Sequence, residues 1–527
     1  MFKILITDPL HDAGIELLGA QDDVTFEVKQ GLNHEGLVAA VRDVDALIVR
    51  SESKVTLEVL QSGGQLQVVG RAGVGVDNID LDAATRRGVA VVNAPTGNIM
   101  AASEHTIAML LALARNVSQA DASMKKGEWL RSAFMGVEVR GKVLGIIGLG
   151  RVGSEVARRA RGMDMEVIAY DPFVAVERAN RVGVELGEFE WVLSNCDFLT
   201  LHTPLSDSTK HLIGKREIKL LKPTVRIVNV ARGDLIDEEA LLDALIEGTV
   251  AGVALDVFSK EPPADLRIVQ HPKVVTTPHL GASTIEAQSG VATEVVEQVL
   301  AVLHGQPAPF TVNVPLLAPE DHVLMAPYLQ VLVDLGKIAI QLSEGQLSSI
   351  RFSFEGDIGF GDTTILKAAG LMGLLDQVTE ERVNLVNALL VAEQRGIQVT
   401  EEHGLSLGEY TNLISIRLTS DKGDVIVTGT QVRERTHLIR VSDYWFDVSI
   451  ASPYLLLIEN LDRPGMIGAV GGIAGDNDIN ISFMEVGRLE ERGRAMMVVG
   501  VDDLIAEPVL TKLRSMPNIY GARLVRM

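Results

Sequence analysis

Residues 142–171 read KVLGIIGLGRVGSEVARRARGMDMEVIAYD, and this stretch decides the fold of the chain. The apolar run 142–147 is long enough for a buried parallel strand and too short for a helix. A glycine-containing turn and a helix follow, and a second apolar run, 166–170, ends at Asp171. This order of strand, turn, helix and strand predicts a βαβ unit of a doubly wound parallel sheet.

The turn has the pattern G-x-G-x-x-G, formed by Gly148, Gly150 and Gly153. We expect Gly148 to make the tight turn, Gly150 to leave room for a pyrophosphate, and Gly153 to let the helix pack on the strand. The glycine pattern alone is a weak signal, but here a strand, a helix and an acid accompany it. Asp171 would accept hydrogen bonds from the ribose hydroxyls and repel a 2′-phosphate, which predicts NAD rather than NADP as the cofactor.

Length and composition limit the remaining possibilities. The 527 residues allow three or four domains, and the 47% of apolar residues can fill several cores. The net charge of −22 argues against a nucleic-acid or anionic-membrane surface. The single cysteine, Cys196, fits a reducing compartment, and no histidine or cysteine spacing suggests a metal site. With no signal peptide and no apolar run approaching membrane-spanning length, we expect a soluble cytoplasmic protein.

Residues 1–95 alternate short apolar runs with amphipathic segments, which predicts a small doubly wound parallel sheet. Arg50 and Arg71 each follow a predicted strand of this sheet. Because the carboxyl ends of parallel strands line the ligand crevice, two arginines there suggest an anionic ligand. Surface arginines that neutralise nearby acids would give the same pattern, so the residues alone leave both interpretations open.

The long apolar segment 97–116 predicts a buried linking helix, and 283–303 predicts a helix that returns to pack on the first sheet. The dinucleotide unit would then be inserted into the first domain, with a cleft and two linkers between them. Prolines at 307, 309, 315 and 319 mark a linker. Beyond it we expect a mixed α/β region, with helices near 328–341 and 381–395 and strands near 348–354, 413–419 and 424–430. Residues 452–527 show the β-α-β-β-α-β order of a ferredoxin-like fold.

Three residues in the inserted domain could form a hydride-transfer site: Arg232, Glu261 and His279. A histidine can exchange a proton with the substrate oxygen while hydride moves, and a carboxylate on its second nitrogen would hold one tautomer. An arginine can grip a substrate carboxylate in bidentate fashion. Each residue taken singly could be structural: a surface arginine, a capping glutamate and a histidine before a turn. However, each follows a strand of the same predicted sheet, which favours a common site.

The motifs GLGRVG, YDP, HTPL, NVARGDLIDEEAL, ALDVFSKEPP and TTPHLGAST, in this order, resemble the D-2-hydroxyacid dehydrogenase family. The tail, with DRPG in its last domain, resembles the long members of that family. The resemblance implies residues 1–98 as the first part of a flavodoxin-like substrate domain and 99–283 as a Rossmann-type NAD domain. Residues 284–305 would be the return helix, 306–451 a linker and mixed α/β intervening domain, and 452–527 a ferredoxin-like ACT domain.

The resemblance also assigns site residues. It implies that Arg232, Glu261 and His279 are catalytic. It implies a cofactor site made by Val74, Gly148, Gly150, Arg151, Val152, Gly153, Asp171, Thr203, Val230, Ala231, Arg232, Asp256, His279, Leu280, Gly281 and Ala282. It implies that Arg50, Arg71 and Arg131, the last from a neighbouring subunit, hold the phosphate and carboxylate of 3-phosphoglycerate.

The implied activity is NAD-dependent oxidation of 3-phosphoglycerate to 3-phosphohydroxypyruvate, the entry step of phosphorylated serine biosynthesis, with 2-oxoglutarate reduction as a side activity. A glyoxylate or hydroxypyruvate reductase, or an NAD-responsive corepressor-like binding protein, is the alternative. In the ACT domain the resemblance implies that Asn460, Asp462 and Asn480 hold an L-serine effector, although relatives tend to carry an aromatic residue or histidine at the position of Asn460. A dimerisation module without a ligand is the other interpretation. A homo-oligomer, dimer or tetramer, is expected.

Overall fold

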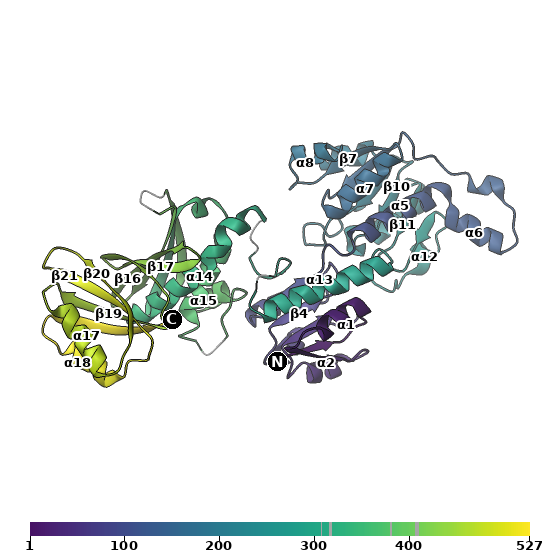
Figure 1. The fold of residues 1–527 in the computed structure, drawn as a ribbon. Helices are drawn as coiled ribbons and strands as arrows, with labels where there is room; N and C mark the ends of the chain where they lie inside the picture. The colour runs from purple at the N-terminus through teal and green to yellow at the C-terminus, as the bar shows by residue number, and fades with distance from the viewer. Residues whose placement is uncertain (307, 316–318, 380–381, 406–409) are drawn as a thin grey trace.

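The computed structural model describes residues 1–527 apart from 307, 316–318, 380–381 and 406–409. Figure 1 shows the chain in two parts joined near residue 310: the first three hundred residues on the right, and the C-terminal residues on the left. Positions 307 and 316–318 of the predicted proline-rich linker, and the start of the helix expected at 381, lie outside the described residues.

The first sheet is parallel and has the strand order β2-β1-β3-β4-β5. This is the flavodoxin-like order, so the predicted fold of the first domain is confirmed. Its strands are β1 (Phe2–Ile6), β2 (Val24–Val28), β3 (Ala46–Val49), β4 (Val68–Arg71) and β5 (Ala90–Asn93). The helices between them are α1 (Asp12–Gly19), α2 (His34–Ala40), α3 (Leu57–Ser62) and α4 (Leu81–Arg86).

The second sheet has seven parallel strands in the order β12-β11-β10-β9-β6-β7-β8. Counted from β6, this contains the Rossmann order 3-2-1-4-5-6, as predicted. The strands are β6 (Val143–Ile147), β7 (Glu166–Tyr170), β8 (Glu185–Leu186), β9 (Phe198–Leu201), β10 (Arg226–Asn229), β11 (Gly252–Leu255) and β12 (Val274–Thr276). The helices are α5 (Ile99–Arg115), α6 (Val117–Lys125), α7 (Arg151–Gly162), α8 (Val176–Arg181), α9 (Phe189–Asn195), α10 (Lys215–Ile218), α11 (Glu238–Glu247) and α12 (Leu266–Val269), with short 3-10 turns η1 (Arg131–Phe134) and η2 (Gly233–Leu235).

The two segments that link these sheets touch where Gly97 meets Gly290. Helix α13 (Ile285–Leu303) returns to the first sheet and buries Val295, Val296 and Val299 in its core. A Cβ on Gly97, just before α5, would lie 2.6 Å from the backbone nitrogen of Val291, so the two linkers touch backbone to backbone. Glu294 accepts the N–H groups of Thr96 and Gly97 at 3.1 and 3.0 Å, which fixes this crossing.

The intervening region is a six-stranded sheet, β14-β13-β15-β16-β17-β18, covered by helices. The strands are β13 (Leu347–Gly356), β14 (Gln398–Gly404), β15 (Asn412–Ser420), β16 (Gly423–Val432), β17 (Arg435–Val441) and β18 (Tyr444–Ser449), and the helices are α14 (Pro319–Leu342), α15 (Thr364–Leu375) and α16 (Ala388–Gln394), with a 3-10 turn η3 (Asp357–Phe360). The helix expected at 381–395 is wrong in its first half. Asn387 is the N-cap of α16, and the Asn384 N–H donates to the Asn387 side chain at 2.9 Å, so this segment forms a capped turn.

Helix α14 corrects a second expectation. The 20-residue part Val323–Leu342 contains an 18-residue window of mean hydropathy 1.6, enough by length and composition to cross a membrane. The expectation that no apolar run approaches this length is therefore wrong. In the structure, however, α14 is a core helix: Val331, Leu332, Leu335 and Ile338 are buried against α15 and the sheet.

The last 74 residues form a four-stranded antiparallel sheet, β20-β21-β19-β22, with two helices on one face. The elements are β19 (Tyr454–Leu461), α17 (Met466–Asp476), β20 (Ile481–Arg488), β21 (Arg494–Val501), α18 (Glu507–Arg514) and β22 (Ile519–Arg526), which confirms the predicted order. The opposite face contributes Leu455, Leu457, Val498 and Val525 to the core of the intervening region. Because that core is continuous, the C-terminal half packs as one body in Figure 1.

Candidate active site

His279 and Glu261 form a hydrogen-bonded pair at the carboxyl end of the second sheet. Nδ1 of His279 lies 2.7 Å from Oε2 of Glu261, and both side chains are partly exposed. His279 has a left-handed backbone, with φ of 56°, an uncommon conformation for a residue with a side chain. Among the described residues none bonds the second ring nitrogen, Nε2, so it is available to a ligand.

Glu261 is held in its charged form. Burial acts to raise the pKa of its carboxyl, but hydrogen bonds from His279 and from the N–H of Phe258, at 3.1 Å, outweigh it and bring the pKa below its ordinary value. A carboxylate that stays ionised can only accept a hydrogen bond, which fixes a proton on Nδ1 of His279. This leaves Nε2 to give or take a proton.

Asp256 anchors the loop that carries His279. Its side chain is fully buried and accepts the N–H groups of Leu280 at 2.7 Å and Gly281 at 2.8 Å. Thr277 and His105 donate to the same carboxylate, at 2.5 and 3.2 Å. Burial acts to raise the pKa of Asp256, but these hydrogen bonds hold it below its usual range. The anchor fixes the left-handed turn at His279.

A second group of residues lies at the carboxyl end of the first sheet, where the segment 71–78 gathers three arginines. A Cβ on Gly73 (φ 155°) would lie 1.6 Å from Nη1 of Arg71, and one on Gly75 would lie 1.8 Å from Nη2 of Arg232. These two glycines therefore leave the space that the guanidinium groups fill. Asn78 donates to the carbonyl oxygen of Arg50 at 2.7 Å and so holds the third arginine's loop.

The three arginines repel one another. Burial first, and then the charges of Arg232 and Arg50, lower the pKa of Arg71 to about 10. The Nε of Arg71 is buried and has no hydrogen-bond partner among the described residues. Clustered cations with an unsatisfied donor are stabilised by a bound anion, so this corner is suited to one.

Asp8 holds the Arg50 loop by hydrogen bonds. It follows β1, is 2% exposed, and accepts the N–H groups of Arg50 and Ser53 at 2.5 and 3.2 Å. The hydroxyl of Ser53 donates to its other oxygen at 2.5 Å. Sequence reasoning missed Asp8 as a site-supporting residue, although its position after a strand of the first sheet was a usable signal.

The glycine turn after β6 has the geometry expected of a dinucleotide site. A Cβ on Gly148 would meet the carbonyl oxygen of His202 at 2.7 Å, and one on Gly153 would meet that of Gly148 at 2.1 Å, so both positions require glycine. A Cβ on Gly150 would meet nothing within 4 Å. The space before α7 is thus open where a pyrophosphate would lie, next to the helix N-terminus.

Two further polar groups fit a dinucleotide here. Asp171, after β7, accepts the N–H groups of Leu149 at 2.8 Å and Phe173 at 2.9 Å, which ties the acid to the glycine turn. The hydroxyl of Thr203 is buried and has no hydrogen-bond partner in the described chain. The methyl group of the same residue lies close to where a Cβ on Gly148 would be. An unsatisfied hydroxyl at the mouth of the turn is the kind of group that a ligand satisfies.

The other predicted cofactor residues surround these two clusters. Val230, Ala231 and Arg232 follow β10, and Leu280, Gly281 and Ala282 follow His279. A Cβ on Gly281 would lie 3.0 Å from Val230, so these two loops touch. Val74 is 38% exposed within the segment 71–78, and Val152 is in the first turn of α7. Arg131 is exposed on η1, the short 3-10 turn that follows α6.

A pocket of about 380 Å³ opens beside the dyad. Its walls come from the loop of Glu261, from α12 and from the end of β12. The lining residues are Phe258, Glu261, Pro262, Pro263, Val269, Thr276, Thr277, Pro278 and His279.

Comparisons with known proteins agree with this arrangement. The model of the D-isomer specific 2-hydroxyacid dehydrogenase NAD binding domain matches residues 107–281. Models of the D-3-phosphoglycerate dehydrogenase intervening domain and of the ACT domain match residues 324–442 and 454–518. D-3-phosphoglycerate dehydrogenase of Methanocaldococcus jannaschii is 42% identical over 100% of both chains, and that of Bacillus subtilis is 41% identical over 100% of this chain and 99% of its own.

The chain belongs to the D-3-phosphoglycerate dehydrogenase family.

Among solved structures, the TT0316 protein from Thermus thermophilus matches with TM-score 0.55 and 32% identity, over 59% of this chain and 99% of its own. D-lactate dehydrogenase from Aquifex aeolicus, complexed with NAD and lactic acid, matches with TM-score 0.54 and 27% identity over the same shares. The predicted dehydrogenase family and its NAD cofactor are confirmed.

The three residues predicted for the ACT effector do not meet within one chain. Asn460 is 1% exposed, and its Oδ1 has no hydrogen-bond partner in the described residues. Asp462 pairs with Arg488 at 3.2 Å near the same end of β19. Asn480 instead precedes Ile481, which pairs with Val501 opposite Tyr454, at the other end of β19. Six residues of strand, about 20 Å, separate the two ends.

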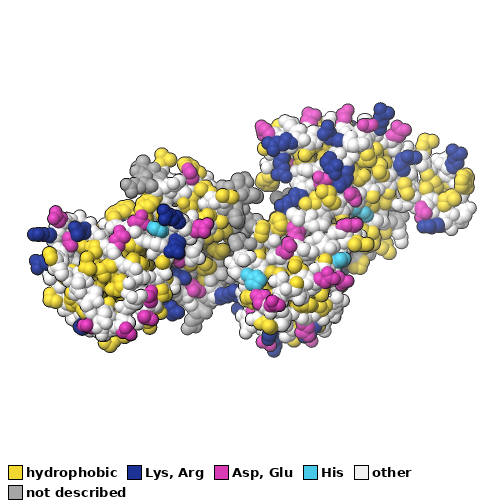
Figure 2. Space-filling model, in the orientation of Figure 1, with side chains coloured by type: hydrophobic (Ala, Val, Ile, Leu, Met, Phe, Trp, Pro, Cys, Tyr) yellow, Lys and Arg dark blue, Asp and Glu magenta, His cyan; other side chains and the backbone are white. Residues whose placement is uncertain are grey.

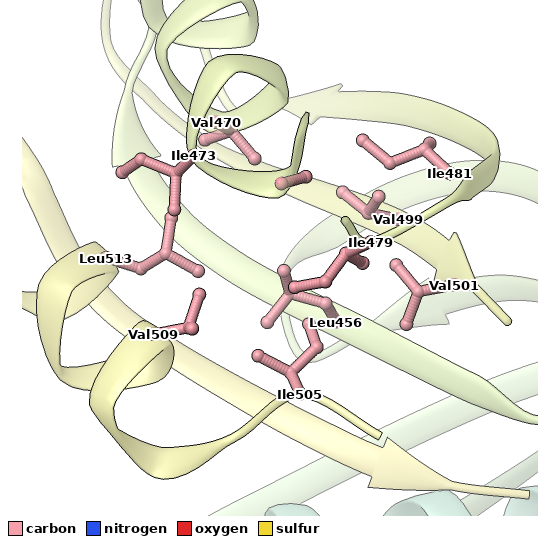
Figure 3. A pocket seen from close by; sticks show the side chains of 11 residues that line it. Leu456, Val470, Ile473, Ile479, Ile481, Val499, Val501, Ile505, Val509 and Leu513 are labelled. Atoms are coloured by element: carbon pink, nitrogen blue, oxygen red, sulfur yellow. The ribbon is translucent and has the colours of Figure 1, made fainter. Parts of the chain in front are cut away.

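The ACT cavity in Figure 3 is not an effector site. It lies between α17, α18 and the sheet, and the side chains that point into it are all apolar, among them Leu456, Ile473 and Leu513. Its volume, about 10 Å³, is the space of a single water molecule. An amino acid would bring charges that nothing here can satisfy.

Proposed function

We propose that this protein oxidises 3-phosphoglycerate with NAD and yields 3-phosphohydroxypyruvate, the first step of phosphorylated serine synthesis. One observation carries the proposal: the segment 71–78 gathers Arg50, Arg71 and Arg232 within one network of charges. A substrate with a phosphate and a carboxylate needs several cationic partners, and a lactate-type substrate needs fewer. The names of the full-length relatives support the same substrate.

The chain's own residues account for the proton that the reaction releases. Arg232 holds the substrate carboxylate, and Nε2 of His279 accepts the proton of the substrate hydroxyl. Glu261, ionised and 2.7 Å from Nδ1, stabilises the imidazolium that results. NAD, when bound, would accept the hydride from the substrate carbon that bears this hydroxyl. The electron pair and the proton thus depart to different partners.

We infer that the phosphate is held by Arg50 and Arg71. The free Nε of Arg71 and its lowered pKa favour a dianion at this corner. For the cofactor, we propose that the pyrophosphate lies over Gly150 beside Arg151 and Val152, and the ribose near Asp171. The nicotinamide would face Val74, Thr203, Asp256 and the loops 230–232 and 279–282.

The test is a spectrophotometric assay of NADH formation with 3-phosphoglycerate and with D-glycerate. Two charge-assisted phosphate contacts are lost with D-glycerate, so we expect its kcat/KM to be lower by about 100-fold or more. Equal efficiency for the two substrates would remove the case for a phosphate pocket and favour a glyoxylate or hydroxypyruvate reductase.

We propose that the protein is a homo-oligomer in which Arg131 enters a neighbour's site. The arm formed by α6 and η1 exposes large apolar side chains, and Figure 2 shows such side chains at the right-hand tip of the molecule. They include Val117, Met124, Trp129, Leu130 and Met135, which are 50–83% exposed. The pocket beside His279 has apolar walls that such an arm can fill. The molar mass in solution, by light scattering, tests this: a monomer of 56.8 kDa would contradict it.

We also propose that L-serine binds between two ACT domains of paired chains. Asn460 and Asp462 would come from one copy and Asn480 from the other, because one chain separates them by the length of β19. The buried, unpaired Oδ1 of Asn460 supports a ligand at this end. The NADH assay repeated with L-serine tests it, and an unchanged rate together with no serine binding by calorimetry would favour dimerisation without an effector.

We place the enzyme in the cytoplasm. Cys196 is fully buried, and burial raises the pKa of its thiol to about 12, which keeps it in the unreactive form. Fractionation of cells followed by the NADH assay tests the location.

A further inference from the structure

Asp77 and Arg232 form an ion pair between the two sheets of the dehydrogenase half. Asp77 lies between β4 and α4, on the first sheet, and Arg232 follows β10 of the second. Nε of Arg232 is 3.2 Å from Oδ2 of Asp77, and Arg232 is the less exposed partner, at 28% against 63%. The pair therefore joins the two sheets at the corner where the substrate is proposed to bind.

The ion pair fixes how the guanidinium is presented. Of its five N–H groups, the one on Nε meets Asp77, and one on Nη1 donates to the carbonyl oxygen of Ala231 at 2.7 Å. No described residue bonds Nη2, which lies over Gly75. Two partners on different nitrogens leave a planar group little freedom to rotate, so its free N–H groups point in a defined direction.

Asp77 is also the acid able to adjust the charge of this corner. Arg50 and Arg232 are the cations whose charges reach Arg71, and Asp8 and Asp77 are the acids whose charges reach it. Asp8 is buried, and both of its oxygens already accept hydrogen bonds from the Arg50–Ser53 loop. Asp77 is the one that contacts a guanidinium directly.

We propose that Asp77 is a positioning residue that couples closure of the cleft to the orientation of Arg232. Because the partners belong to different sheets, a movement of one domain away from the other would break the ion pair. With the pair formed, Arg232 presents both N–H groups of Nη2 and the remaining N–H of Nη1 to the substrate carboxylate. The proposal rests on the proposed function, in which Arg232 holds that carboxylate.

A competing role would have the opposite sign. If Asp77 simply occupied Arg232 until substrate displaced it, removing the carboxylate would tighten substrate binding. If Asp77 positions Arg232, removing it weakens binding of a ligand that carries a carboxylate and spares a ligand that carries only phosphate. Glycerol 3-phosphate, used as a competitive inhibitor, is the phosphate-only probe.

The experiment compares Asp77→Asn, which keeps an acceptor oxygen but loses the charge, with Asp77→Ala, which loses both. Asp82→Asn, an acid in the first turn of α4, is the control for the loss of one charge. We expect KM for 3-phosphoglycerate to rise about tenfold in Asp77→Asn and further in Asp77→Ala, with the NADH dissociation constant unchanged. The inhibition constant of glycerol 3-phosphate should stay within about twofold or fall. Asp82→Asn should resemble the wild type.

Three results would overturn the proposal: an unchanged KM, a lower KM, or an equal loss of affinity for both ligands. A readout that needs no substrate separates this outcome from a failure of the proposed function. Small-angle scattering with NADH alone should show a more compact dehydrogenase half in the wild type than in Asp77→Ala. If the wild type does not oxidise 3-phosphoglycerate, the proposed function fails, and equal compactness of the two proteins is what would reject the role of Asp77.

Discussion

The ring of Phe310 lies 5.3 Å from the guanidinium carbon of Arg151, and the two residues join the linker to the glycine turn. Phe310 is held on the first sheet: its N–H donates to Gln298 of α13 at 3.0 Å, and its carbonyl oxygen accepts from Asn93 at 3.2 Å. The segment that leads to the C-terminal half therefore touches a residue proposed to bind the pyrophosphate. A displacement of the linker would therefore move Arg151 at the proposed cofactor site.

Phe310→Ala is expected to raise KM for NAD by about two- to fivefold, the value of one partly exposed cation–π contact. KM for 3-phosphoglycerate should change less, because no hydrogen bond or ion pair joins Arg50, Arg71 or Arg232 to the described residues of the linker. Phe360→Ala, which removes a 76% exposed ring of the intervening region, is the control. Equal NAD affinity in Phe310→Ala and wild type would show that the stacking has no role in cofactor binding.

Glu261→Gln is expected to lower kcat by about 10- to 100-fold while leaving NADH binding intact. The amide keeps the size of the side chain but cannot stabilise an imidazolium. Although burial opposes them, the bonds from His279 and Phe258 leave the pKa of Glu261 below its ordinary value, so the carboxylate is ionised throughout the neutral range. Loss of this negative charge should move the acid limb of the pH–rate profile for oxidation toward lower pH. A profile that does not move would show that Glu261 only shapes the loop.

Gly73→Ala tests the space that Arg71 occupies. The new Cβ would lie 1.6 Å from Nη1, on a backbone with φ of 155° that favours glycine. We expect KM for 3-phosphoglycerate to rise about tenfold or more, with KM for NAD within about twofold. Gly64→Ala, where a Cβ meets nothing within 4 Å, should have no effect. A normal KM in Gly73→Ala would mean that Arg71 does not bind the phosphate.

Asp256→Asn tests the anchor of the catalytic loop. The folded-state pKa of Asp256 is depressed, so its contribution to stability is present above the unfolded value of about 3.9 and is lost as pH falls through the folded pKa. At pH 7 we expect the variant to be less stable by about 1–3 kcal/mol, and this difference should narrow below about pH 4. Denaturant unfolding at several pH values measures it. Asp164→Asn, at a 75% exposed acid of the same half, is the control, and a difference independent of pH would contradict the assignment.

Local patterns were enough to predict both parallel sheets. The strands 24–28 and 46–49 and the turn at Gly148, Gly150 and Gly153 carry signals that depend on neighbouring residues alone. The intervening region was harder, because β14 and β17 lack a regular apolar alternation and are specified by their partners in the sheet. The turn before α16 was missed because Asn384 and Asn387 bond to each other, a contact that periodicity does not reveal.

The site was predictable where strand ends determined it. His279, Arg232, Arg50 and Arg71 all lie at strand ends, and the residue order gave their approximate place. Asp77 and His105 were not predicted as site residues. Asp77 acts on an arginine 155 residues away, and His105 reaches Asp256 across 151 residues, so tertiary folding alone brings them together.

The most direct test of the account is a single-turnover measurement of NADH formation by His279→Asn with saturating 3-phosphoglycerate and NAD. The account predicts that the hydride-transfer rate falls by about 1,000-fold or more while the NADH dissociation constant stays within about threefold of the wild-type value. A rate close to that of the wild type would contradict it, because Nε2 of His279 could not then be the group that takes the substrate proton.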